Sequence, residues 1–148
     1  MVLFMEWFNI FGLIFIVAIM IPNIIFAIKN KDGFENKWNN RLVMILEQIG
    51  RFCCFGFMIF NIPGTWFGWW SLEAFAVYLI SDITLIAAYC ALWVIYRKKN
   101  SVSKALLLSV IPSVLFLFSG IMSRSLPLIL GSLIFAPTHI LISYKNAE

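Results

Sequence analysis

The chain has 148 residues, of which 62% are hydrophobic and 12% are charged, and its net charge is +4. Soluble domains carry about 25% charged residues, and a small fold has too much surface to hide this much apolar side chain, so a water-soluble globule is excluded. The basic residues lie in short segments between apolar runs, which is typical of membrane topology signals rather than of a nucleic-acid site.

Five apolar runs are long enough to cross a bilayer as helices, which takes roughly 20 residues. Lipid offers no partner for backbone N–H and C=O groups, so helices are expected, and the runs are too continuous for the alternating strands of a barrel. The sequence predicts an all-α, polytopic integral membrane protein in which residues 1–148 form one membrane domain. The expected transmembrane helices cover about residues 3–28, 42–61, 72–96, 105–121 and 126–144.

The first run is expected to stay in the mature protein. A cleaved secretion signal begins with basic residues, and residues 1–8 contain no Lys or Arg. Near the other end of the run, Asn23 directly follows Pro22. A proline inside a helix frees a carbonyl group and kinks the chain, so Asn23 is a candidate polar group beside a kink.

The second run carries two charged residues, Glu47 and Arg51. They are four residues apart and therefore lie one turn apart on the same face of a helix. Continuing that face leads to Cys54 and Met58, whereas the opposite face is suited to lipid. Because charges inside a membrane normally face the interior of the bundle, this face is expected to point inward.

The later runs add two ionisable residues. Asp82 lies near the middle of the third run, and His139 follows Pro137 and Thr138 in the fifth. Counted from the ends of their runs, Arg51 and Asp82 lie at similar depth and are expected to pair near the midplane. Glu47, His139 and Asn23 form a second expected layer, nearer to one membrane face.

The connections between the runs predict the orientation. Nine basic residues lie in the connections on one side of the membrane and one, Arg124, lies on the other. By the positive-inside rule, the N-terminus is outside and the C-terminus is cytoplasmic. Trp66, Trp69 and Trp70 would then form an interfacial belt at the outer end of the third helix. Frequent Ile, Lys and Asn is typical of an AT-rich bacterial genome, so a bacterial cytoplasmic membrane is expected.

These residues favour a function in which a cytoplasm-facing polar cavity binds or transports a small polar or anionic solute. Arg51 would attract the anion, because a guanidinium group recognises carboxylate and phosphate. Asp82 or Glu47 would exchange a proton, and His139 and Asn23 would line the inner mouth. Whether the chain is an enzyme stays open.

Three alternatives are weighed against this function. The polar groups could simply join helices, at about 0.6 kcal/mol for each hydrogen bond. The chain could be an accessory or assembly subunit without turnover, as a homo-oligomer or with a partner subunit. It could also be a lipid-modifying enzyme, with Glu47 or His139 as the acid–base group and Arg51 as an anion clamp.

No cofactor or metal is expected, because a metal site needs three or four converging ligands. The cysteines Cys53, Cys54 and Cys90 all lie inside apolar runs and are expected to be buried thiols rather than a disulfide framework. The expected surroundings are membrane lipids, with no nucleic acid.

Overall fold

The structure is a computed structural model that describes residues 8–29, 40–62, 64–67, 69–96 and 102–147. Within these residues the fold is all-helical, and two isolated bridges are the extent of strand pairing. Residues 3–7 of the first predicted run lie outside the described part. The helices are α1 (Ile10–Lys29), α2 (Arg41–Ile59), α3 (Leu72–Ile95), α4 (Val102–Ser123) and α5 (Leu126–Ala147).

Four of these helices, α2 to α5, are long and apolar enough to cross a membrane. In the described residues α1 contributes a shorter apolar stretch, Ile10–Phe26. The all-α fold is confirmed, and four helices support the predicted membrane protein. The fifth span and the orientation of the termini stay predictions.

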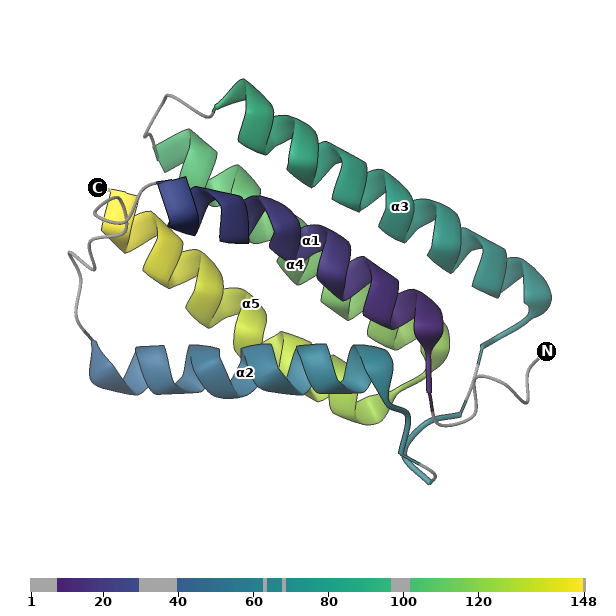
Figure 1. Cartoon of the computed structure of the whole chain (residues 1–148). Coiled ribbons are helices and arrows are strands. Elements are labelled where there is room, and N and C mark those ends of the chain that lie inside the picture. Colours follow the sequence, from purple (N-terminus) through teal and green to yellow (C-terminus); the bar gives the residue numbers. More distant parts are fainter. Residues whose placement is uncertain (1–7, 30–39, 63, 68, 97–101, 148) are drawn as a thin grey trace.

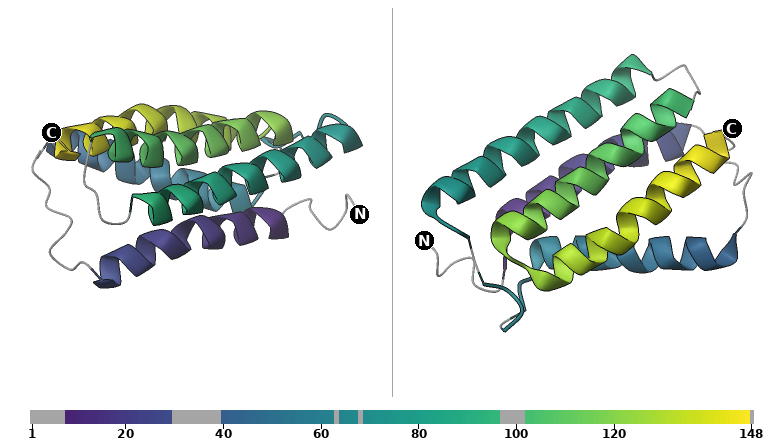
Figure 2. Two further views of the ribbon diagram at one scale, coloured as in Figure 1. Left: turned by 90° about the horizontal axis from the view of Figure 1, so that it is seen from above. Right: turned by 180° about the vertical axis from the view of Figure 1, so that it is seen from behind.

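The helices form a ring in the order α1, α2, α5, α4, α3. α5 packs between α2 and α4, α3 packs on α4, and α1 packs on both α2 and α3. Figure 1 shows α2 and α3 at opposite sides of the bundle, with α5 crossing next to α2. The left view of Figure 2 shows α1 on the side of the bundle away from α5. α1 therefore closes the ring between α2 and α3.

Aromatic side chains join the helices inside this ring. The Phe116 ring of α4 makes edge contacts with Phe55 of α2 and Phe135 of α5, with ring centroids 5.9 and 5.4 Å apart. Phe15 of α1 meets Tyr78 of α3 in the same way, at 5.6 Å. Such pairs add about 0.5–1.5 kcal/mol to the packing energy, so they help to fix which helices are neighbours.

Side chains that accept hydrogen bonds from free N–H groups mark where three helices begin. Asn9, Asn40 and Ser71 accept from the backbone N–H groups of Gly12, Val43 and Ala74. A cap of this kind typically contributes about 1 kcal/mol. Asn9 also donates from Nδ2 to the Tyr78 hydroxyl at 3.2 Å, which ties the start of α1 to α3.

The turn between α4 and α5 is held by Arg124. Its φ angle of 53° lies in the left-handed region, which favours glycine at the end of a helix. The side chain provides compensating contacts, because Nη2 donates to the Phe67 carbonyl at 2.7 Å and the guanidinium lies 5.0 Å from the Trp70 ring. The Trp70 indole in turn donates to the Ile121 carbonyl at 2.9 Å. These contacts anchor one of the three predicted belt tryptophans.

Glycine allows α2 and α5 to approach closely. A Cβ atom on Gly50 would lie 2.7 Å from the Phe135 backbone nitrogen, and one on Gly131 would lie 2.9 Å from the Cys53 Cβ. Both distances are shorter than real Cβ contacts, so no larger side chain fits without movement. Small residues at helix interfaces are typical of membrane proteins, because they let backbones pack against each other.

Candidate functional site

The Glu47 carboxylate lies between two basic side chains. Its Oε1 accepts a hydrogen bond from Nη2 of Arg51, one turn along α2, and lies 3.3 Å from Nδ1 of His139 on α5. The Glu47 side chain is 4% exposed, whereas Arg51 is 35% and His139 is 21% exposed. We call these three residues the Glu47 cluster. A buried acceptor is thus shared by two donors that each reach the surface.

Two features of the sequence bring the Glu47 cluster together. The spacing of four residues places Glu47 and Arg51 on one face of α2, as predicted. The close approach at Gly50 then brings α5 near enough for His139 to reach Glu47. The imidazole is also held by its neighbour Phe135, because the two rings stack with centroids 4.6 Å apart and an interplanar angle of 17°.

The charges of the Glu47 cluster depend on His139. With a neutral imidazole, the carboxylate and the guanidinium cancel. A protonated imidazole gives the cluster one excess positive charge. Arg51 makes no further hydrogen bond within the described residues, so most of its donors remain available for a ligand. The cluster is therefore chemically suited to receive an anion when His139 takes up a proton.

Asn23 of α1 is hydrogen-bonded to Tyr89 of α3. The Tyr89 hydroxyl donates to Asn23 Oδ1 at 2.9 Å, and Asn23 Nδ2 donates to the Ile19 carbonyl at 3.0 Å. Of the five predicted site residues, the structure brings Glu47, Arg51 and His139 into contact, while Asn23 lies on α1, which packs on α2.

Asp82 is separate from the others. It is 0% exposed, and its Oδ2 accepts a hydrogen bond from Ser119 of α4 at 2.7 Å. The expected Arg51–Asp82 pair does not form, because Arg51 pairs with Glu47. The physical reason is the helix order: α3 packs on α1 and α4, so the Asp82 face of α3 meets α4 and not α2. Depth along a helix, which the sequence gives, does not determine this order.

Three further polar residues were not anticipated as partners. Tyr89 and Ser119 are those described above. The third is Lys104. The predicted spans place it in a connection, but it lies in the first turn of α4, where the residue is only 6% exposed. Its ammonium is 5.1 Å from the Trp93 ring and 5.4 Å from the Phe26 ring, at distances typical of cation–π contacts. Trp93 lies on the same face of α3 as Asp82, about three helical turns further along, and that spacing was the available signal.

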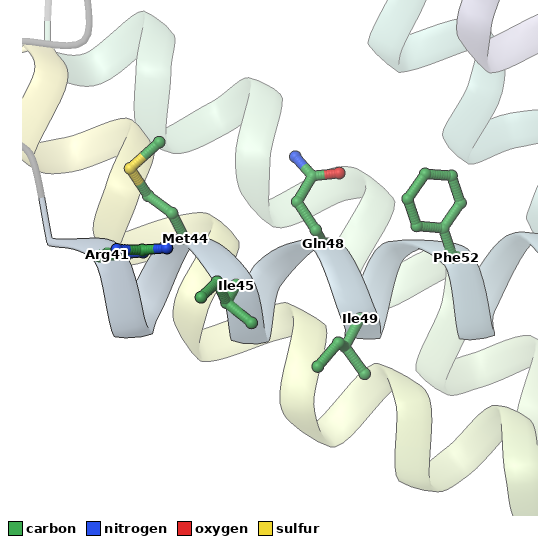
Figure 3. A pocket seen from close by; sticks show the side chains of 6 residues that line it. All are labelled: Arg41, Met44, Ile45, Gln48, Ile49 and Phe52. Atoms are coloured by element: carbon green, nitrogen blue, oxygen red, sulfur yellow. The ribbon is translucent and has the colours of Figure 1, made fainter.

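Two open hollows on the surface of the described residues were compared with the positions of the predicted site residues. The larger, of about 510 Å³, lies on the outward face of α2, and the Gln48 amide points away from the helix there (Figure 3). It is lined by Arg41, Met44, Ile45, Gln48, Ile49 and Phe52. The smaller, of about 360 Å³, lies between α3 and α4 beside Ser81 and Phe118. None of the five predicted site residues lines either hollow.

Across the described residues, no group of three or more His, Cys, Asp or Glu side chains is placed to hold a metal ion. Comparison of the chain with protein-family models, curated proteins and solved structures gave no match. The Glu47 cluster is the candidate site, because a basic group there meets the surface next to a buried carboxylate.

Proposed function

We propose that this protein is a small multi-pass membrane protein that binds a small anionic solute at the Glu47 cluster. One observation carries the proposal. Arg51 is one-third exposed, while the carboxylate that it shares with His139 is buried. A guanidinium presents planar, forked donors that match carboxylate and phosphate groups. The exposed side of Arg51 is therefore the part of the cluster that a ligand reaches.

Proton uptake couples to anion binding in this proposal. A proton on His139 adds a positive charge, and that charge competes with Arg51 for the Glu47 carboxylate. More of the N–H donors of Arg51 are then available to bind the solute. The hydrogen-bonded pair of Asn23 and Tyr89 supplies an amide and a hydroxyl on α1 and α3, and α1 packs on α2. A site that takes up a proton and an anion together is suited to a carrier. The proposal therefore extends from binding of the anion to its transport across the membrane.

Anion binding is tested by thermal unfolding of the full chain in mild detergent, with phosphate, acetate or succinate as the probe. A ligand at about one hundred times its Kd stabilises the folded protein by about 2.7 kcal/mol. For a chain of this size, that raises Tm by roughly 5–10 °C. We expect the increase with at least one probe, larger at mildly acidic than at mildly alkaline pH, and we expect Arg51→Gln to abolish it.

Arg41→Gln is the matched control. Arg41 is an exposed basic residue of the same helix but lies outside the Glu47 cluster. This variant should keep the anion effect. Equal loss in both variants would indicate a general response to positive charge, and the absence of any increase with the wild-type chain would refute the proposed site.

The proposed setting is a bacterial cytoplasmic membrane crossed five times, with α1 as the first span. The nine-to-one distribution of basic residues supports an outside N-terminus and a cytoplasmic C-terminus. A green fluorescent protein fused to the C-terminus should fluoresce in bacterial cells, and alkaline phosphatase fused there should be inactive. The opposite pair of results would reverse the orientation.

A further inference from the structure

The Asp82 carboxyl group is fully buried and incompletely hydrogen-bonded. One oxygen, Oδ2, lies 2.7 Å from the Ser119 hydroxyl, while the other, Oδ1, is buried without a hydrogen-bond partner. No Lys, Arg or His side chain forms an ion pair with Asp82 among the described residues. An ionised carboxylate at this position would leave a charged oxygen without any donor, which is costly in an apolar medium.

The Ser119 hydroxyl has a single hydrogen atom but makes two short oxygen–oxygen contacts. Its Oγ lies 2.7 Å from Asp82 Oδ2 and 2.6 Å from the Leu115 carbonyl oxygen. The carbonyl oxygen only accepts, and so does an ionised carboxylate. With an ionised Asp82, one of these two oxygen–oxygen contacts would have no hydrogen between its atoms. A hydrogen on Asp82 satisfies both, because Asp82 then donates to Ser119 and Ser119 donates to Leu115.

The groups packed around Asp82 supply no compensating positive charge. Tyr78, one turn earlier on α3, is a neighbouring titratable group, and its hydroxyl accepts a hydrogen bond from Asn9 of α1. From α4, the group that faces Asp82 is Ser119. The basic residue of that helix, Lys104, lies against aromatic rings near the far end of α3. Within the described part of the chain, the hydrogen-bond partner of Asp82 is thus a neutral hydroxyl, and no basic side chain is paired with it.

We propose that Asp82 is a proton-binding site inside the membrane, where the protonated carboxyl group donates to Ser119 and Ser119 donates to the Leu115 carbonyl. Loss of the proton from Asp82 reverses the direction of the hydrogen bond between Asp82 and Ser119. The Ser119 hydroxyl turns to the carboxylate, and its bond to α4 breaks. The site involves α3 and α4, whereas the proposed anion site involves α2 and α5, so each proposal can fail without the other.

Infrared spectroscopy of the full chain in lipid vesicles tests this site, because a protonated carboxyl group has a C=O stretching band that a carboxylate lacks. At neutral pH, we expect such a band in the wild-type chain, a shift of the band in D₂O, and its loss in Asp82→Asn. Ser119→Ala should keep the band but shift it to higher frequency, since the hydrogen bond to Ser119 is gone.

Glu73→Gln is the matched control, because Glu73 is an exposed carboxyl group of the same helix and its replacement should leave the band unchanged. A wild-type spectrum without the band at neutral pH would overturn the proposal, as would a band that survives in Asp82→Asn. If Asp82→Asn does not fold, the wild-type and Ser119→Ala spectra decide, because an ionised Asp82 would give no such band in either.

Discussion

Gly50→Ala is expected to lower the Tm of the protein in mild detergent by roughly 2–12 °C. A new Cβ atom would lie 2.7 Å from the Phe135 backbone nitrogen and 2.8 Å from its Cα, so α2 and α5 must move apart. Overpacking of this kind costs about 1–3 kcal/mol, and backbone atoms cannot swing aside as a flexible side chain does. Thermal unfolding followed by circular dichroism measures the change.

Gly56→Ala provides the comparison within the same helix. No atom lies within 4 Å of the Cβ position at Gly56, so the methyl group meets open space. Alanine is also favoured over glycine inside a helix by about 0.5–1 kcal/mol. Gly56→Ala should therefore leave Tm unchanged or raise it slightly. Equal effects of the two substitutions would mean that the close approach of α2 and α5 does not contribute to stability.

The helices were predictable because long apolar runs and capping residues are local features of the chain. α3 begins at Leu72 as predicted, directly after the capping Ser71, and α5 begins at Leu126 as predicted. α4 extends beyond the predicted 105–121 at both ends, because its first turns include Ser103 and Lys104. Hydropathy assigned Lys104 to a connection, but its ammonium is accommodated against aromatic rings inside the fold.

Contacts within one helix were also predictable, whereas those between helices were not. Glu47 and Arg51 pair because a spacing of four residues is sufficient to place them together. Their link to His139 depends on which helix packs on α2, and the close contact at Gly50 is part of what determines this. No comparable local feature indicates a neighbour for Asp82. Equal depth suggested Arg51 as its partner, while packing of α3 on α4 provides Ser119 instead.

Glu47→Gln is expected to destabilise the protein by about 2 kcal/mol. The neutral amide leaves the Arg51 guanidinium without its carboxylate and weakens the contact with His139. Removing one partner of a fully buried ion pair costs about 3–5 kcal/mol, and the one-third exposure of Arg51 reduces that cost because the guanidinium is not fully enclosed by the protein. Denaturant unfolding in detergent measures the difference in free energy.

The double variant Glu47→Gln with Arg51→Gln separates the ion pair from the individual side chains. If the pair acts as a unit, the double variant should be less destabilised than the sum of the two single variants, with an interaction energy of about 0.5–3 kcal/mol. Glu73→Gln, at an exposed carboxylate, should cost less than about 0.5 kcal/mol. Additive effects of the two α2 substitutions would show that Arg51 is not held in place by Glu47. The guanidinium would then not be pre-positioned for an anion, and the proposed coupling between His139 protonation and anion binding would lose its physical basis.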